Sequence, residues 1–204
     1  MKIAIIDYGM GNLKSVEMAF HRVGATGAFV TDDPAAVANA DKAVLPGDGA
    51  FDATVDRLRE AGADRVVHEF AASGRPFLGI CVGMQAIMTS SEEGRPDARG
   101  LDLIPGRVKR FAGSRELKVP QIGWNQLCFP RPSALFNDLP EGAYVYFLHS
   151  YYCDPSDESC VTAICDYGLS YCAGLEKGNV HATQFHPEKS GEVGLSILRN
   201  FAAL

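Results

Sequence analysis

The sequence predicts an α/β fold: an open, mixed but mostly parallel central sheet with helices on both faces. Two observations support this class. In the first half of the chain, short apolar runs alternate with segments of helical periodicity, which is typical of a parallel sheet with crossover helices. In the second half, apolar runs follow one another with turn residues between them, which indicates that further strands extend the sheet. The 204 residues show no linker, repeat or low-complexity segment, so we expect a single domain over residues 1–204.

The first half begins with a buried strand expected over residues 2–7. Asn12 can cap the helix that follows. Within it, Leu13, Val16 and Phe20 recur at helical spacing, and Gly24 ends it. The further strands expected here are 28–31, 42–45 and 76–80, and the further helices are 50–61, 63–73 and one that begins at residue 82.

The second half contains shorter apolar runs that end in a helical pattern. Val193, Ile197 and Phe201 share one face of a closing helix expected over 191–204. Residues 90–100 form the most loop-like stretch. The strands expected here are 108–111, 121–127, 143–148, 160–165 and 179–185.

Composition and charge narrow the class of protein. Hydrophobic residues make up 47% of the chain and charged residues 22%, which is ordinary for a globular domain. The net charge is −6, and an acidic surface repels phosphate backbones, so we expect no nucleic-acid partner. Asp7 interrupts the first apolar run too early for a signal peptide. Because no run approaches the roughly 20 apolar residues of a membrane helix, we expect a soluble, cytoplasmic protein without a membrane partner.

No motif in the sequence predicts a cofactor or a metal. The six cysteines include no Cys-x-x-Cys pair, so the signal for a zinc site is weak. Gly9-Met10-Gly11 resembles the start of a dinucleotide fingerprint, but Lys14 stands where its third glycine would be. There is also no phosphate-binding G-x-x-x-x-G-K-[ST] loop.

Gly79-Ile80-Cys81-Val82-Gly83 has the pattern of a nucleophile elbow with cysteine in place of serine. Such an elbow turns a strand sharply into a helix and holds the nucleophile in a strained conformation, so glycines are needed on either side. The positive end of the helix also favours a thiolate at Cys81. The motif alone is equally compatible with an ordinary turn that buries a cysteine.

His186-Pro187-Glu188 is a candidate for the base of the same site. Proline favours an extended residue before it, and residues two apart in an extended segment point to the same side. Glu188 could therefore orient the ring of His186 and stabilise its cation. The alternative is a loop histidine beside a surface glutamate. The preceding strand favours the catalytic interpretation, because catalytic groups collect at strand ends in open α/β sheets.

A glycine-rich turn, Pro46-Gly47-Asp48-Gly49, follows the third expected strand. Such a turn can aim backbone N–H groups at a developing oxyanion. Standing alone, it would be interpreted as a plain turn.

These three motifs together resemble those of the class I, or triad, glutamine amidotransferases. They agree in order and in rough spacing across nearly the whole chain. The resemblance implies that Cys81 attacks glutamine, that His186 and Glu188 are its base pair, and that the N–H groups of Val82 and Asp48 hold the oxyanion. It also implies that further positions lie at the oxyanion loop or near the glutamine: Gly47, Gly49, Gln85, Ser150 and Tyr151. The family usually has an apolar residue at position 48, so the aspartate puts the resting geometry of this loop in doubt.

Further segments resemble a narrower group within this family, the glutaminase subunits of imidazole glycerol phosphate synthase. They are Asp7-Tyr8-Gly9-Met10-Gly11-Asn12, Gly123-Trp124-Asn125 and Phe147-Leu148-His149-Ser150-Tyr151. The resemblance implies a role in histidine biosynthesis, as a heterodimer with a (β/α)₈ cyclase subunit that uses the ammonia. It places Asn12, Trp124, Tyr146 and Lys189 at or near the cyclase interface. Trp124 alone could equally be a core aromatic.

Three other functions remain open from the sequence. The chain could serve a different synthase, in which case the Gly-Trp-Asn segment would lie away from any interface. It could be a stand-alone γ-glutamyl hydrolase or Cys-His peptidase of similar architecture. It could also be a binding module without catalysis, which the intact triad argues against.

Overall fold

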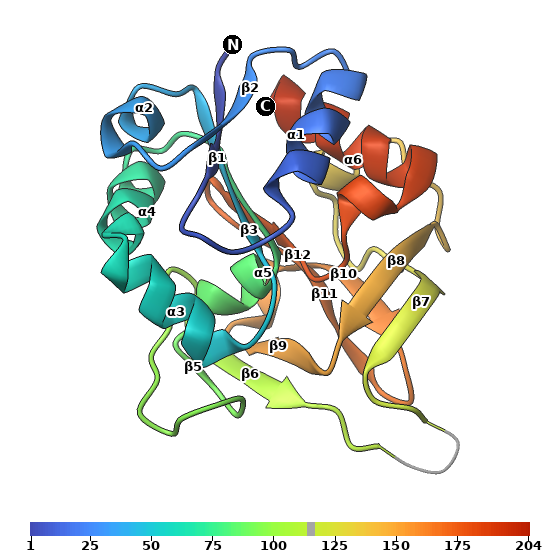
Figure 1. Cartoon of the computed structure of the whole chain (residues 1–204). Helices are drawn as coiled ribbons and strands as arrows, with labels where there is room; N and C mark the ends of the chain where they lie inside the picture. The colour runs from blue at the N-terminus through green and yellow to red at the C-terminus, as the bar shows by residue number, and fades with distance from the viewer. Residues whose placement is uncertain (114–116) are drawn as a thin grey trace.

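The computed structural model describes residues 1–113 and 117–204 and contains a ten-stranded mixed sheet with helices on both faces (Figure 1). The sheet has the order β2-β1-β3-β4-β12-β11-β9-β6-β5, and β10 pairs with β11. Its strands are β1 (Ile3–Ile6), β2 (Ala28–Thr31), β3 (Lys42–Gly47), β4 (Phe77–Cys81), β5 (Ser90–Ser91), β6 (Gly106–Arg110), β9 (Tyr151–Pro155), β10 (Val161–Asp166), β11 (Ser170–Lys177) and β12 (Val180–Thr183).

The direction of the strands changes between β12 and β11. The strands β2, β1, β3, β4 and β12 are parallel. Beyond β12, the pairings β12–β11, β11–β10, β11–β9 and β9–β6 are antiparallel. The expected α/β class and the mixed extension are confirmed. The carboxyl ends of β3, β4 and β12 meet at one edge of the sheet, where ligands bind in this class of fold.

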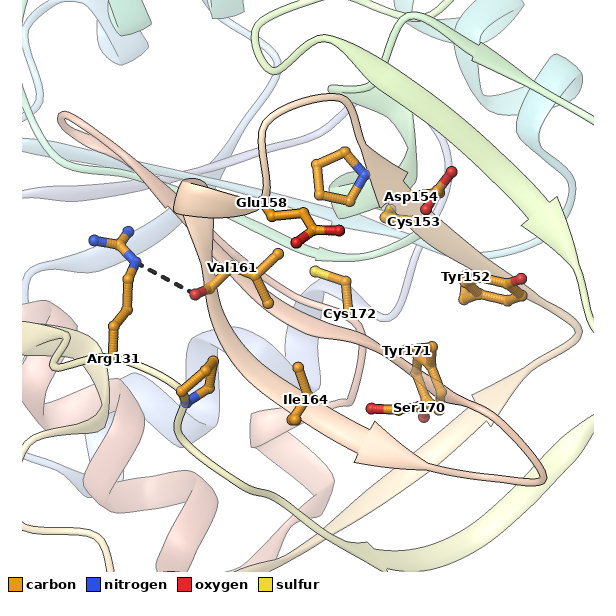
Figure 2. A pocket seen from close by; sticks show the side chains of 12 residues that line it. Arg131, Tyr152, Cys153, Asp154, Glu158, Val161, Ile164, Ser170, Tyr171 and Cys172 are labelled. Carbon is orange, nitrogen blue, oxygen red and sulfur yellow. Dashed lines mark hydrogen bonds between the residues drawn. The ribbon is translucent and has the colours of Figure 1, made fainter.

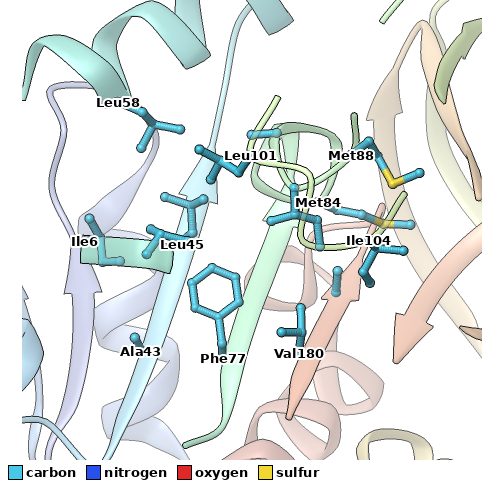
Figure 3. Close-up of a cluster of buried hydrophobic side chains, with 14 of the residues drawn as sticks. Ile6, Ala43, Leu45, Leu58, Phe77, Met84, Met88, Leu101, Ile104 and Val180 are labelled. Carbon is cyan, nitrogen blue, oxygen red and sulfur yellow. The ribbon is translucent and has the colours of Figure 1, made fainter. Parts of the chain in front are cut away.

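The helices cover both faces because successive residues of each buried strand point in opposite directions. Leu58 of α3 and Val67 and Phe70 of α4 pack against one face of the sheet, and Figure 3 shows the cluster that includes Leu58. Phe20 of α1 and Phe201 of α6 pack against the other face of the sheet. The helices are α1 (Leu13–Arg22), α2 (Pro34–Ala38), α3 (Phe51–Glu60), α4 (Ala63–Ala72), α5 (Val82–Ala86) and α6 (Gly191–Ala203), and the short 3-10 turns are η1 (Ala134–Phe136), η2 (Glu158–Cys160) and η3 (Pro187–Lys189).

Two of the strands expected in the sheet extension lie outside it. The strands β7 (Gln121–Gln126) and β8 (Tyr144–His149) form a separate two-stranded antiparallel sheet. Val145 and Phe147 of β8 are fully buried, whereas Trp124 is 54% exposed. Apolar alternation along these segments predicted strands, but it carries no information about which sheet a strand joins.

Several elements were not predicted from the sequence, among them β9, β11 and α2. The strand β9 begins two residues after β8 ends, so no turn signal separates them. The strand β11 contains glycine and charged residues, which weaken the strand pattern. The helix α2 has only five residues, and its cap is the side chain of Asp33, which accepts from the Ala35 N–H at 2.9 Å; the sequence predicted no helix between the strands 28–31 and 42–45. Among the described residues, no helix is both long and apolar enough to cross a membrane.

Candidate active site

Cys81 is the last residue of β4 and immediately precedes α5. Its backbone has φ 55° and ψ −112°, an unusual conformation for a residue with a side chain. A β-carbon at Gly83 would overlap the carbonyl oxygen of Leu45 in β3, and one at Gly79 would lie 3.0 Å from the carbonyl oxygen of Gly83. The strained turn and the need for both flanking glycines are therefore confirmed.

The glycine-rich turn after β3 lies against this elbow. Gly47 is the register partner of Cys81 across β3 and β4. A β-carbon at Gly47 would lie 2.7 Å from the backbone carbon of Val82, so only glycine allows this approach. Asp48 is exposed, and its Oδ1 accepts from the N–H of Gly49 at 2.8 Å. Its carboxylate is thus bonded within its own turn.

His186 and Glu188 form a buried pair beside the nucleophile. The distance from His186 Nδ1 to Glu188 Oε1 is 2.8 Å, and only 9% and 2% of the two side chains are exposed. Burial by itself lowers the pKa of His186, but hydrogen bonds to the Cys81 sulfur and to Glu188 outweigh it and raise the pKa to about 10. The arrangement favours an imidazolium between a thiolate and a carboxylate.

The backbone that presents this pair differs from the expected extended strand end. The strand β12 ends at Thr183, and the turn η3 begins at Pro187. His186 itself is extended, with φ −97° and ψ 98°. Glu188 therefore reaches the ring from a 3-10 turn and not from a continued strand, since the proline stops strand pairing.

A cavity of about 210 Å³ opens over Cys81. Its volume is smaller than that of pockets for drug-sized ligands and suits an amino acid. It contains several of the predicted site residues and four more that the sequence did not indicate. The lining residues are Asp48, Gly49, Cys81, Val82, Gln85, Ser150 and Tyr151, together with Glu93, Pro120, Leu148 and His149.

Glu93 brings a carboxylate to the wall of this cavity. Its Oε2 accepts from the N–H of Phe51 at 2.9 Å, at the first residue of α3. Burial raises the pKa of Glu93, the bond from Phe51 acts in the opposite direction, and the charge of Asp52 adds to the increase. Glu93 lies in the loop-like stretch 90–100, where no periodicity or motif could have indicated it. A carboxylate here could hold a cationic group of a ligand.

A chain of polar groups connects the far wall of the cavity to the nucleophile. The Nε2 of Gln85 donates to the carbonyl oxygen of Tyr151 at 3.1 Å and to Oε1 of Gln184 at 3.2 Å. The Nε2 of Gln184 donates to the Cys81 sulfur at 3.8 Å. The sequence placed Gln184 within the His186 motif but gave it no role, because an amide beside a thiol is visible only in three dimensions.

The candidate interface residues come from elements that adjoin one another, because η3 packs against both β8 and α1. The rings of Trp124 and Tyr146 meet edge to face, with centroids 6.1 Å apart, on the exposed side of the β7–β8 sheet. The alternative of Trp124 as a core aromatic is wrong, since more than half of it is exposed. Lys189 is exposed in η3. Asn12 caps α1, where its Oδ1 accepts from the Ser15 N–H at 3.3 Å.

A second cavity, of about 420 Å³, lies between β9, β10 and β11 (Figure 2). Its floor holds Cys153 and Cys172, and burial raises the pKa of both thiols far above the ordinary value. The Nε of Arg131 donates to the carbonyl oxygen of Val161 at 3.3 Å. Neither thiol is an activated nucleophile, whereas the smaller cavity contains the strained Cys81, so we assign the chemistry to the smaller cavity.

Comparison with known proteins gives the same family throughout. The family model "Glutamine amidotransferase class-I" matches residues 4–203. The imidazole glycerol phosphate synthase subunit HisH of Syntrophotalea carbinolica is 54% identical, with 98% of each chain covered. The subunit of the same name from Geobacter sulfurreducens is 52% identical, covering 100% of this chain and 99% of the relative. A solved structure described as a glutamine amidotransferase superimposes with a TM-score of 0.76 over both whole chains at 18% identity, which supports the fold.

Proposed function

Because this chain belongs to the class-I glutamine amidotransferase family, we propose that Cys81, His186 and Glu188 hydrolyse the side-chain amide of L-glutamine to glutamate and ammonia. One observation carries the assignment of residues. The strained Cys81 lies at the N-terminus of α5 and interacts electrostatically with His186, whose Nδ1 contacts a buried carboxylate. This is the geometry of an activated nucleophile with an oriented base.

The first half of the reaction forms a thioester. The Cys81 thiolate attacks the side-chain carbonyl carbon of glutamine, and the carbonyl oxygen becomes an oxyanion. The N–H groups of Val82 and Asp48 stabilise this oxyanion, because they belong to the helix start and the turn that approach each other at Gly47. His186 then gives its proton to the departing nitrogen as the C–N bond breaks, and ammonia leaves.

The second half of the reaction releases glutamate. The neutral His186 takes a proton from a water molecule, whose oxygen attacks the thioester carbon. The C–S bond breaks and the thiolate of Cys81 returns, with the proton on His186. Glu188 holds the ring through Nδ1 in both halves, so that Nε2 carries the transferred proton.

The walls of the cavity provide groups for recognising the ends of the amino acid. We assign the Glu93 carboxylate to the α-ammonium group of glutamine. Gln85, Ser150 and Tyr151 line the opposite part of the cavity and are assigned to the remaining polar contacts of the substrate. The cavity of about 210 Å³ has the size of a single amino acid, which supports free glutamine as the substrate.

We propose that the ammonia passes to the (β/α)₈ cyclase subunit of imidazole glycerol phosphate synthase, so that the chain acts in histidine biosynthesis. The names of its relatives support this partner. An exposed apolar surface supports docking close to the triad. This surface, called here the β7–β8 face, consists of Ile122, Trp124, Tyr144, Tyr146 and Leu148. Leu148 also lines the cavity over Cys81, so a partner on this face would lie beside the ammonia source.

The decisive experiment combines labelling with a bypass of the glutaminase. A chloroketone analogue of glutamine should label Cys81 and leave the exposed Cys128 unmodified. The Cys81→Ala variant, reconstituted with the cyclase, should lose glutamine-dependent synthesis and keep synthesis from added ammonium. Labelling at Cys128 would reject the assignment of the nucleophile. Loss of ammonium-dependent synthesis would reject the assigned partner, provided that the complex still forms.

A further inference from the structure

We propose that Gln184 is a positioning residue that holds the sulfur of Cys81 in its thiolate form, and that Gln85 fixes the orientation in which it does so. This inference deepens the proposed function, since it concerns the same nucleophile. It rests on a continuous set of hydrogen bonds that begins at a backbone carbonyl and ends at the sulfur.

The orientation of both amides follows from the carbonyl oxygen of Tyr151. That oxygen can only accept, so the atom of Gln85 that faces it at 3.1 Å must be the amide nitrogen. The same nitrogen faces Gln184 at 3.2 Å, so the atom of Gln184 at that end must be its oxygen. The amide nitrogen of Gln184 is therefore the atom that faces the Cys81 sulfur at 3.8 Å.

The other end of the chain is also fixed. The Nδ1 of His149 lies 2.8 Å from the carbonyl oxygen of Tyr151 and must donate to it. This oxygen thus accepts from both His149 and Gln85. Gln184 is fully buried, so water does not compete for its amide. A rotation of the Gln184 amide would place two amide nitrogens against each other at the Gln85 contact and an oxygen against the Cys81 sulfur, which is unfavourable in a buried network.

Two neighbours of the sulfur have opposite preferences. The carbonyl oxygen of Leu148, 4.0 Å away, can accept only from an S–H group and so favours the neutral thiol. The N–H group of Gln184 can only donate to the sulfur and so favours the thiolate. His186 supplies a second donor. Removing the Gln184 donor leaves the carbonyl of Leu148 opposed only by His186 and the start of α5, so the thiolate becomes a smaller fraction at a given pH.

The test uses a Cys128→Ser background. It measures the rate at which iodoacetamide alkylates Cys81 at a series of pH values, and peptide mass spectrometry detects the alkylated Cys81. The variant Gln184→Leu should move the midpoint of this profile upward by about one pH unit, which is a tenfold lower reactive fraction at pH values below both midpoints, as expected for a hydrogen bond to a charged acceptor. Gln184→Met, which is longer and unbranched, serves the same purpose if the leucine variant does not fold. The matched control is Thr183→Val, because Thr183 is equally buried one residue away and its hydroxyl donates to the carbonyl of Phe185.

The role of Gln85 is tested in the same assay. Gln85→Met should move the midpoint in the same direction but by less, because Gln184 keeps its donor and loses only its orientation. The double variant Gln85→Met/Gln184→Leu should have the same midpoint as Gln184→Leu alone, since the two amides act as one unit. An unchanged midpoint in both Gln184 variants, each folded, overturns the inference, as does an equal shift in Thr183→Val. Alkylation does not require glutamine turnover. If the variants behave as expected but the chain shows no glutaminase activity even with the cyclase and its nucleotide ligand, the proposed function is rejected and this inference stands.

Discussion

The backbone of His186 is bonded directly to that of Tyr146: the His186 N–H donates to the Tyr146 carbonyl oxygen at 3.0 Å. The hydroxyl of Ser190 joins them a second time, since it donates to the His186 carbonyl oxygen at 2.6 Å and accepts from the Tyr146 N–H at 2.9 Å. The ring of Tyr146 contacts the exposed Trp124. The proposed base of the triad is therefore anchored to the strand that carries the β7–β8 face.

Truncation of the exposed aromatic on this face should weaken docking and leave the fold intact. Because Trp124 is 54% exposed, we expect Trp124→Ala to reduce the affinity for the cyclase by at least about tenfold, the scale of an aromatic hot spot. The unfolding midpoint of the isolated chain should change little. Isothermal titration calorimetry and thermal unfolding measure the two quantities. Met18→Ala is the matched control, since Met18 is an exposed apolar residue of α1. Equal affinity losses in both variants would contradict docking on the β7–β8 face.

The elbow should tolerate no side chain at Gly83. A β-carbon there overlaps the backbone oxygen of Leu45, which cannot move without shifting β3. We expect Gly83→Ala to lower the free energy of unfolding by about 1–3 kcal/mol, as overpacking does, and to lower glutaminase activity further by displacing Val82. Urea unfolding and glutamate production test this. Gly24→Ala is the control for backbone strain alone, because a β-carbon at Gly24 meets nothing within 4 Å although its φ is 87°. Full activity in Gly83→Ala would contradict the assigned geometry.

The side chain of Asp48 should not take part in catalysis. Its carboxylate accepts from the Gly49 N–H within the turn, and the proposed mechanism uses only the Asp48 backbone N–H. We expect Asp48→Val to change glutaminase kcat/KM by less than roughly tenfold, under about 1.4 kcal/mol of barrier. Loss of a true oxyanion donor costs about a hundredfold or more. Asp48→Asn, which can keep the bond to Gly49 without the charge, separates the two contributions. A hundredfold loss in both variants would assign a role to the carboxylate itself.

His149 should make the fold sensitive to acid. Burial lowers the pKa of His149 to about 4, with a further contribution from the nearby His186, although the bond to the Tyr151 carbonyl acts in the opposite direction. The folded pKa lies below the unfolded value of about 6.5. The stability that the neutral ring contributes is therefore complete above about pH 6.5 and is lost as the pH falls toward 4.

The measurement compares wild type with His149→Phe, which keeps an aromatic ring among Phe111, Phe147 and Tyr171. Between pH 7.5 and 4.5, the free energy of unfolding of the wild type should fall by about 2 kcal/mol more than that of the variant. Urea unfolding at the two pH values gives this difference. A parallel fall in both proteins would show that His149 does not titrate in this range.

Local sequence patterns were sufficient to predict most helices and strands and the elbow at Cys81. Gly79 and Gly83 flank a single cysteine after an apolar strand, and their spacing encodes a backbone conformation that the structure contains. Most of the parallel half of the sheet was predictable for the same reason, since helices with clear ends follow β1 and separate β3 from β4. In these cases the information lies within a few consecutive residues.

Contacts between distant segments were not predictable. The alternation in β7 and β8 predicted two strands but could not show that they leave the main sheet. Glu93 reaches the cavity from a loop without a pattern, where its carboxylate contacts the start of α3, 42 residues earlier. Gln184 and Gln85 are 99 residues apart. No periodicity relates such positions, so their contacts become visible only once the chain is folded.

We expect the partner to control the rate of the glutaminase through the turn that contains Asp48. A glutaminase that acts without its synthase wastes glutamine and releases ammonia into water, where protonation removes its nucleophilicity. The turn of Asp48 offers a point of control, because glycines flank it on both sides and Gly49 already has a φ of 87°. A peptide with such neighbours can rotate at little steric cost. A resting form with the Asp48 N–H turned away would keep Cys81 and His186 together and leave the oxyanion without one donor.

Partner binding would then act by favouring the form in which this N–H points to the oxyanion, which requires contacts that differ between the two forms. We therefore expect very slow glutamine hydrolysis by the isolated chain. Addition of the cyclase and its nucleotide ligand should increase kcat by at least about a hundredfold, because one oxyanion donor contributes on that scale. The KM for glutamine should change less, since the missing interaction belongs to the transition state. Steady-state glutamate production by the chain alone, with the cyclase, and with the cyclase and ligand measures each step. Hydrolysis at full rate by the isolated chain would reject the gate and favour a stand-alone hydrolase, because a complete oxyanion site would then exist without any partner.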